Sequence, residues 1–302
     1  MNSLRLDIPK TGIAWAPAAC GELVEGIIDH QAFLVSCPID LYSKAKVCLY
    51  SKDMYPHPID CGRWPKASHA VSAALEAWQG DMWDATLEIE SCIPLGKGMA
   101  SSTADIGAAL AATALALGLV PNPVEMTEVA VKVEPTDSTL FPELTVFDHV
   151  RGSFHKHIGK PPPLMVMVFD WGGQIASDNW YGEDSKMLPL LQQQGSLAAR
   201  ALHLVQQGVA LGDGKVLAAG ATLSAFSHQD ILHKPGLESL AQCACGEGAL
   251  GVTVAHSGTV AGLMFPPMEA GQIARIAGTL SNAFPDIQYL GTYHLIGGGI
   301  RW

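Results

Sequence analysis

The sequence lacks the features that mark secreted, membrane-spanning or zinc-binding proteins. Its seven cysteines are odd in number and form no CxxC pair, so they predict neither a disulfide framework nor a zinc site. No N-x-S/T sequon occurs, and the first ten residues carry no apolar core behind a basic end. The longest apolar stretch, residues 106–120, is shorter than the roughly 20 residues that a bilayer span needs. We therefore expect a cytoplasmic protein with no membrane partner.

Charged and aromatic residues are also scarce, at 16% and 7% of the 302 residues, whereas 48% are hydrophobic. This composition can bury a large core, which excludes a disordered chain. The 29 acidic and 18 basic side chains give a net charge of −11. That charge argues against a broad basic face for nucleic acid or anionic lipid. Any anionic ligand must therefore be bound by local features.

The hydrophobic periodicity of the first half predicts a sheet followed by helices. The predicted elements are strands and hairpins over residues 12–50, a helix over 65–78, a strand over 85–93, and helices over 101–118 and 123–133. The length suggests about two domains at roughly 150 residues each.

A stiff, proline-rich segment at residues 159–163 predicts a domain boundary near residue 160, with domains over residues 1–158 and 159–302. The second half contains an apolar strand (164–169), helices (185–227 and 237–243), two strands around residues 256–258, a helix (268–284) and a last strand (287–296). This order fits a ferredoxin-like layer, so the chain as a whole is expected to be an α+β protein.

The most informative segment is the glycine-rich turn PLGKGMASSTA at residues 94–104, which connects a strand to the strongest predicted helix. Gly96 and Gly98 let backbone N–H groups turn toward one point, and the helix start offers free N–H donors and roughly half a positive charge. Lys97 adds a positive charge, and the three hydroxyls that follow can cap the helix, contact phosphate or ligate a metal ion. A phosphate-binding loop needs this construction, whereas an ordinary capped connection is the alternative. The predicted phosphate-binding residues are Pro94, Leu95, Gly96, Lys97, Gly98, Met99, Ala100, Ser101, Ser102 and Thr103.

Residues 94–104 resemble the central motif P-x-G-x-G-L-x-S-S-x-A of the GHMP kinases, with Met99 in place of leucine. Residues 16–26 and 38–40 look like a shortened form of the family's first motif, and residues 251–265 are similar to its glycine-rich third motif. The resemblance implies a kinase that phosphorylates small-molecule alcohols with ATP and Mg²⁺. It also implies an N-terminal domain with a mixed sheet and helices, a ferredoxin-like C-terminal domain, and an active site between them.

Within that family the chain is most similar to the PduX-type L-threonine kinases. This similarity implies that it converts L-threonine to O-phospho-L-threonine for cobalamin biosynthesis. Two alternatives stay open: a kinase for another alcohol such as homoserine, a sugar or a mevalonate-type compound, and a sensor that binds a nucleotide or metabolite without turnover.

The resemblance also implies roles for residues after the second helix. Glu134 is similar to the family's magnesium carboxylate, with Ser102 as its hydroxyl partner; a solvated carboxylate at a helix end is the alternative. We interpret Asp137 as the residue that accepts or orients the proton of the substrate hydroxyl. The alternative for Asp137 is an Asx-turn residue in the segment Pro-Thr-Asp-Ser.

The first motif supplies three candidates on the substrate side, Cys20, Glu22 and Asp40, although a tight strand turn would also explain them. Ala19 stands where some family members have a lysine, so a lysine-assisted deprotonation from that position is excluded. The sequence assigns no residue to the carboxylate or the ammonium of an amino-acid acceptor.

Three histidines, His149, His155 and His157, lie close together in the sequence. A His-x-His pair on a strand points to one face without defining a third ligand. We therefore interpret these histidines as surface or supporting residues rather than as a metal site.

Overall fold

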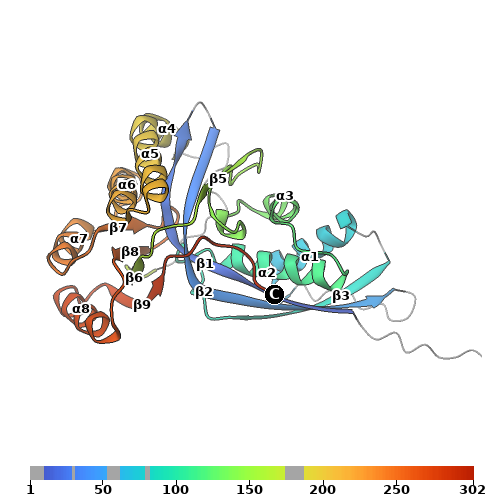
Figure 1. The fold of residues 1–302 in the computed structure, drawn as a ribbon. Coiled ribbons are helices and arrows are strands. Elements are labelled where there is room, and N and C mark those ends of the chain that lie inside the picture. The colour runs from blue at the N-terminus through green and yellow to red at the C-terminus, as the bar shows by residue number, and fades with distance from the viewer. Residues whose placement is uncertain (1–9, 29–30, 53–61, 79–81, 174–186) are drawn as a thin grey trace, which may run out of the picture.

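The computed structural model describes residues 10–28, 31–52, 62–78, 82–173 and 187–302 (Figure 1). Its strands form one sheet with the order β5-β4-β2-β1-β7-β8-β6-β9, and β3 pairs with β2. Every pairing between these described strands is antiparallel, so the expected mixed sheet is wrong in strand direction. The α+β class is confirmed.

Two long strands, β1 (Lys10–Ile28) and β2 (Gln31–Ser51), form the hairpin on which the first half is built. The remaining elements of this half are α1 (Pro65–Trp78), β3 (Trp83–Ser91), α2 (Ser101–Ala116), α3 (Pro123–Val133), the 3₁₀ turn η1 (Ser138–Leu140), β4 (Leu144–Phe147) and β5 (His155–Gly159). The helix α2 packs against β1 and β2 and is buried on nearly all sides. Gly12 on β1 allows this close approach, because a Cβ there would lie 2.0 Å from the carbonyl oxygen of Ala112 on α2.

The second half follows the predicted order of elements. It contains β6 (Met165–Asp170), α4 (Met187–Gln193), α5 (Gly195–Leu211), α6 (Gly214–Ser227), the 3₁₀ turn η3 (His228–Asp230), α7 (Leu237–Gly246), β7 (Gly251–Val254), β8 (Val260–Phe265), α8 (Ala270–Ala283) and β9 (Gln288–His294). Its strand order β7-β8-β6-β9 is that of a ferredoxin-like βαββαβ layer, as the sequence predicted.

The apolar strand β6 is buried on both faces. Val166 and Val168 belong to the large core that includes β1, β2 and α2, whereas Met167 and Phe169 belong to a second core with α7 and α8. Continuous apolar sequence is typical of a strand covered on both sides. None of the described helices combines the length and the apolarity that a membrane span requires.

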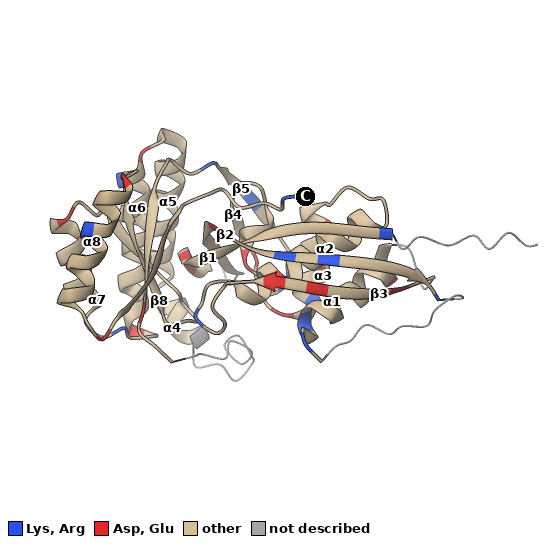
Figure 2. Cartoon of the chain, turned by 90° about the horizontal axis from the view of Figure 1, so that it is seen from below, with Lys and Arg blue, Asp and Glu red and all other residues tan. Residues whose placement is uncertain are grey.

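The two halves share the sheet where β1 meets β7, through the pair Glu22 and Val254. The domain boundary near residue 160 stays a prediction, because the sheet runs through both halves. On the outer part of the hairpin, Lys44–Glu90 and Lys46–Glu88 link β2 to β3 at 3.1 and 3.5 Å. In the view of Figure 2, basic residues lie scattered among acidic ones.

Candidate active site

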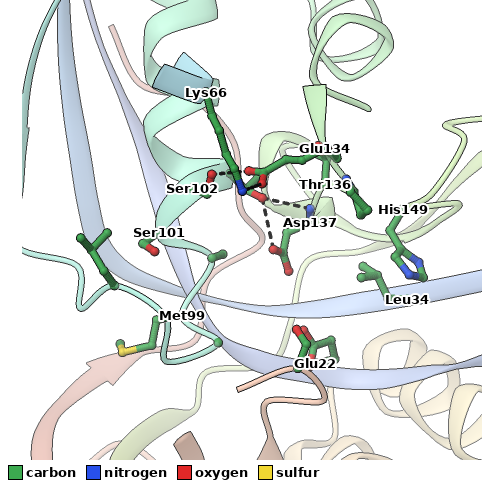
Figure 3. A pocket seen from close by; sticks show the side chains of 17 residues that line it. Glu22, Leu34, Lys66, Met99, Ser101, Ser102, Glu134, Thr136, Asp137 and His149 are labelled. Carbon is green, nitrogen blue, oxygen red and sulfur yellow. Dashed lines mark hydrogen bonds and ion pairs between the residues drawn. The ribbon is translucent and has the colours of Figure 1, made fainter. Parts of the chain in front are cut away.

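A cavity of about 280 Å³ lies where the start of α2, the loop before it and the segment after α3 meet the inner part of β1. Figure 3 shows the side chains that line it. They include most of the predicted loop, both residues of the predicted metal pair and Asp137. The sequence therefore identified a group of residues that the fold brings to one place.

The loop before α2 uses the left-handed backbone region three times, at Gly96 (φ 68°), Gly98 (φ 79°) and Ala100 (φ 55°). Glycine adopts this region without strain, whereas alanine does so at a cost of about 1–2 kcal/mol. Ala100 lies at the point where the chain enters the helix and lines the cavity. A strained residue held at this point indicates that the surrounding structure imposes the turn.

The loop is held in place through its carbonyl groups. The carbonyl of Lys97 accepts from Thr259 N–H at 2.9 Å, and those of Gly98 and Met99 accept from the N–H groups of Gly21 and Ala19, each at 3.1 Å. These partners come from the first and third motifs. Because the attachments use carbonyls, the N–H groups of the loop are left for another partner.

The first turn of α2 has no side-chain cap. Its N-cap is Ala100, so the alternative of an ordinary connection capped by a hydroxyl does not describe this loop. Among the described residues, no acceptor contacts the N–H groups of Ser101, Ser102 or Thr103, and all three residues line the cavity. Free N–H donors at a helix start, together with its positive dipole end, form an anion-binding site.

The positive charge at this cavity comes from a different lysine than expected. Lys97 does not line the cavity; its Nζ pairs with Asp170 Oδ2 at 2.7 Å and donates to Gly173 O at 2.7 Å. Pro94 is likewise absent from the lining. Lys66, at the start of α1, lines the cavity and places its Nζ 2.6 Å from Glu134 Oε2.

The predicted metal pair is assembled. Ser102 Oγ donates to Glu134 Oε1, and the Glu134 side chain is only 9% exposed. Glu134 is therefore not the solvated helix-end carboxylate that the sequence left open. A hydroxyl and a carboxylate oxygen beside an anion-binding helix start are the donor types that Mg²⁺ uses with phosphate oxygens and water.

Asp137 lies deep in the same cavity. It precedes η1 but makes no side-chain cap, so the Asx-turn alternative does not describe it. Its carboxylate accepts from Ser36 Oγ at 2.9 Å and from Thr103 Oγ1 at 3.3 Å. Burial raises the pKa of Asp137 to about 6, although the hydrogen bonds from Ser36 and Thr103 oppose that shift. A carboxylate with such a pKa can accept a proton near neutral pH.

Of the three substrate-side candidates, the structure places one in the cavity. Glu22 lines it opposite Asp137 (Figure 3). Cys20 is fully buried and is not among the lining residues. Asp40 lies outside the cavity, where it accepts from the N–H of His294 at 2.8 Å and contacts its Nδ1 at 2.9 Å.

Sequence reasoning missed a buried polar cluster behind Glu22. His149 is buried and lines the cavity, whereas His155 and His157 lie on the exposed strand β5. Glu25 Oε2 lies 2.8 Å from His256 Nδ1, and Glu25 Oε1 lies 3.8 Å from His149 Nε2. Because the strand period puts residues i and i+3 on opposite faces, nothing in the pattern of β1 predicts that Glu22 and Glu25 converge.

A second cavity of about 510 Å³ adjoins the first and shares Lys66, Leu95 and Ser102 with it. Its other lining residues include Trp64 and Arg63, whose guanidinium lies 4.6 Å from the centroid of the Trp64 ring. A partly apolar cavity next to an anion-binding helix start suits the flat, uncharged end of a nucleotide.

Known proteins resemble this chain along most of its length. The family described as "GHMP kinases N terminal domain" matches residues 66–140. The L-threonine kinase of Salmonella typhimurium is 35% identical over 275 residues, which cover 90% of this chain and 88% of that protein. The L-threonine kinase of Citrobacter freundii is 36% identical over 258 residues, covering 83% of this chain and 85% of that protein.

The fold is also known from solved structures. Homoserine kinase from Cytophaga hutchinsonii matches with a TM-score of 0.71 at 16% identity, covering 100% of this chain and 98% of that one. A structural match at 16% identity shows only that the two proteins share a fold, whereas the relatives at 35% and 36% identity show the family. With the matched motif lying on the cavity just described, the chain belongs to the GHMP kinases and is a small-molecule kinase.

Proposed function

We propose that this enzyme transfers the γ-phosphoryl group of ATP to the hydroxyl of L-threonine, forming O-phospho-L-threonine and ADP. The observation that carries the proposal is the cavity in which an uncapped helix start, the Ser102–Glu134 pair and Asp137 lie together. The threonine acceptor is supported by the two L-threonine kinases that resemble the chain over more than four fifths of its length.

The triphosphate is bound by the free N–H groups at the start of α2 and by the loop of residues 96–100. The neighbouring cavity at Trp64 takes the nucleoside. Phosphoryl transfer mainly requires positioning and neutralisation of charge, which a preorganised loop and a helix dipole provide. In a chain with a net charge of −11, such local features are needed to bind a polyphosphate.

Ser102 and Glu134 are the residues that would hold Mg²⁺, since both present oxygen atoms toward the cavity. The ion would neutralise charge on the phosphate oxygens of ATP. Lys66 is bound to the outer oxygen of Glu134 and so fixes the orientation of that carboxylate.

Asp137 accepts the proton of the acceptor hydroxyl as its oxygen bonds to the γ-phosphorus and the bond from that phosphorus to the bridging oxygen of ADP breaks. Ser36 donates to Oδ1 of Asp137 and Thr103 to Oδ2, so the two hydroxyls hold the carboxylate in one orientation at the cavity. Position 19 is an alanine and offers no lysine to take the proton, so Asp137 is the proposed base.

We further propose that the product serves cobalamin biosynthesis, which the resemblance to PduX-type enzymes supports, and that the enzyme acts in the cytoplasm. The six described cysteines are all free thiols, as is typical of a reducing compartment.

Product analysis tests the proposal directly. The purified protein is incubated with Mg-ATP and an equimolar mixture of L-threonine, L-serine, L-homoserine, mevalonate and galactose. The products are separated by chromatography against authentic standards before mass spectrometry, because the phosphomonoesters of threonine and homoserine have the same mass. We expect one dominant new phosphomonoester, that of threonine. A different phosphomonoester would reassign the acceptor. ATP binding without transfer to any of the five would support a sensor instead.

A further inference from the structure

The inner end of the cavity is acidic and short of positive charge. Three carboxylates line the cavity, those of Glu22, Glu134 and Asp137, and Lys66 is the single Lys or Arg in its described lining. Lys66 is bound to Glu134 at 2.6 Å. The end that holds Glu22 and Asp137 therefore has two carboxylates and neither Lys nor Arg among its described lining residues, and burial lowers the pKa of His149, the histidine that also lines the cavity.

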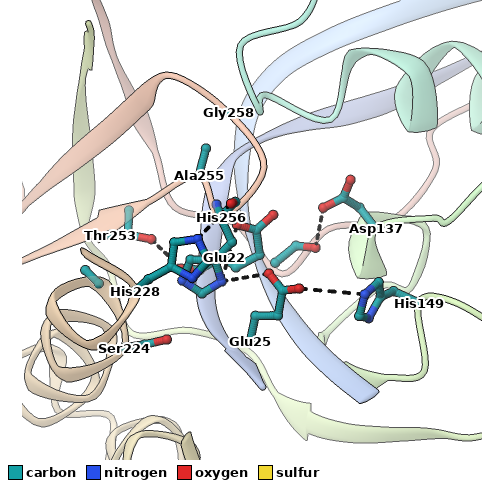
Figure 4. A network of polar contacts seen from close by, with 12 residues as sticks. Glu22, Glu25, Asp137, His149, Ser224, His228, Thr253, Ala255, His256 and Gly258 are labelled. Atoms are coloured by element: carbon teal, nitrogen blue, oxygen red, sulfur yellow. Dashed lines mark hydrogen bonds and ion pairs between the residues drawn. The ribbon is translucent and has the colours of Figure 1, made fainter. Parts of the chain in front are cut away.

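A β-bulge brings two glutamates of β1 to the same side. The pairing of β1 with β2 shifts register between Ala19 and Glu22 and again between Glu22 and Val24. Such bulges re-aim side chains and are common beside active sites. As a result Glu22 and Glu25 both lie against His256, which Figure 4 shows.

The orientation of Glu22 is fixed from behind. Its Oε2 accepts from the backbone N–H of His256 at 2.8 Å, and Glu25 holds the ring of the same histidine at 2.8 Å. Burial lowers the pKa of His256 to about 3, so its ring is neutral and adds no positive charge. The buried Lys234 donates to the carbonyls of Ala255 and Gly258, at 2.9 and 3.0 Å, rather than to Glu22.

The other oxygen of Glu22 faces the cavity. Among the described residues, no hydrogen-bond donor or ion-pair partner contacts Oε1, while the side chain is 9% exposed. Figure 3 shows the Glu22 oxygens directed toward Asp137. Burial and the nearby carboxylates of Glu25 and Asp137 raise the pKa of Glu22 well above its ordinary value, although the charge of Lys234 opposes that shift. A cation that arrives at Oε1 favours the ionised carboxylate and pairs with it.

We propose that Glu22 binds the protonated amino group of the acceptor, which makes amino alcohols the acceptor class of this enzyme. This inference rests on the proposed function and names the group by which its substrate is selected. In L-threonine the amino and hydroxyl groups are on adjacent carbons, and Glu22 and Asp137 line the same cavity, so the proposal assigns the amino group to Glu22 and the hydroxyl to Asp137. Because the described lining has no second cation, the carboxylate of the acceptor contributes less than its amino group.

A metal ion is the competing occupant, because carboxylate and ring atoms of Glu22, Glu25 and His256 all lie within 4.8 Å of one another. The geometry favours the ammonium ion. Glu25 and His256 already bind each other behind the cavity, and of these three residues only Glu22 lines it. A ligand that enters through the cavity therefore meets one carboxylate, which suits an ammonium group and is a poor metal site.

The test compares L-threonine with two analogues, each of which lacks one of its groups. The analogues are (R)-3-hydroxybutyrate, which lacks the amino group, and (R)-1-amino-2-propanol, which lacks the carboxylate. A hydrogen bond between charged groups contributes about 10- to 100-fold in kcat/KM. We expect kcat/KM for (R)-3-hydroxybutyrate to be at least about 10-fold below that for (R)-1-amino-2-propanol.

The variant Glu22→Gln keeps the acceptor for the His256 N–H and removes the charge. It should lower kcat/KM for L-threonine by about 10- to 100-fold and change that for (R)-3-hydroxybutyrate by less than about threefold. Glu90→Gln, on the exposed side of β3, is the matched control and should match the wild type. If Glu22→Gln does not fold, the three acceptors on the wild-type enzyme still decide.

Three results would overturn the inference. The first is equal kcat/KM for L-threonine and (R)-3-hydroxybutyrate. The second is an equal loss for both acceptors in Glu22→Gln. The third is calorimetric binding of Zn²⁺ or Mn²⁺, without nucleotide, that Glu22→Gln abolishes. Failure of all three acceptors to be phosphorylated would instead refute the proposed function.

Discussion

Replacing Gly98 by alanine tests whether function depends on the close packing of the loop against the third motif. Gly98 has φ +79°, where alanine costs about 1–2 kcal/mol. An alanine Cβ would lie 2.3 Å from the Cβ of Ala255 and 2.9 Å from the Cα of Gly258. Carbon atoms need about 3.5 Å, so a displacement of about 1.2 Å is required. Neither contact is the end of a flexible side chain, so the backbone must move.

The displacement falls on the segment that is proposed to hold the triphosphate. A misplacement of about 1 Å in a reacting group can cost about 10²-fold in rate. We therefore expect Gly98→Ala to lower kcat/KM for ATP by about 10²-fold. We also expect it to reduce the free energy of unfolding by more than the backbone term of about 1–2 kcal/mol.

Gly118→Ala separates the two effects. Gly118 has φ +80°, and no atom lies within 4 Å of its added Cβ. A denaturant titration should show that the variant Gly118→Ala loses about 1–2 kcal/mol of its free energy of unfolding, because alanine is strained at this φ. Its kcat/KM should equal that of the wild type. Wild-type kcat/KM in Gly98→Ala would refute the reasoning, as would equal kinetic losses in the two variants.

Three further predictions concern the chemistry of the cavity. Asp137→Asn should lower kcat by about 10²-fold or more with little change in KM for ATP, because it removes the base and keeps the shape; near-normal turnover would exclude Asp137 as the base. Because the pKa of Asp137 is about 6 and its base form is the deprotonated one, kcat/KM should fall as pH drops below about 6 in the wild type, and this acidic limb should be absent from the residual activity of Asp137→Asn. Ser102→Ala should raise the Mg²⁺ concentration needed for half-maximal rate, and an unchanged magnesium titration would contradict a role in holding the ion.

Much of the fold could be predicted because the patterns involved are local. The alanine-rich helix α2, its preceding strand and the proline-initiated helix α3 each carry their own signals over consecutive residues. The short strands β4 and β5, of four and five residues, were not predicted. The join of β1 to β7 pairs Glu22 with Val254, and no local pattern indicates a contact between residues so far apart.

The residues of the site also fall into two groups, those that a local motif predicts and those that only the fold brings together. Ser102 and Asp137 belong to compact motifs, and the structure brings both to the cavity. The cation was misassigned because a lysine next to the loop glycines suggests a phosphate contact, whereas folding directs Lys97 to Asp170 and brings Lys66 from another helix. The convergence of Glu22 with Glu25 depends on a bulge, which shifts the strand period by a residue without a sequence signal of its own.

The bulge also explains why the proposed acceptor end of the cavity lies where β1 meets β7. Gly21 has φ +61°, and a Cβ there would lie 2.2 Å from the carbonyl oxygen of Val254 on β7. The close approach that only glycine permits is therefore what places Glu22 beside the His256 N–H and toward the cavity. The loop before α2 is attached to the same place, since its Gly98 carbonyl accepts from Gly21 N–H. The loop before α2 and the proposed acceptor carboxylate are thus fixed to one short stretch of β1, which holds the two at a constant separation.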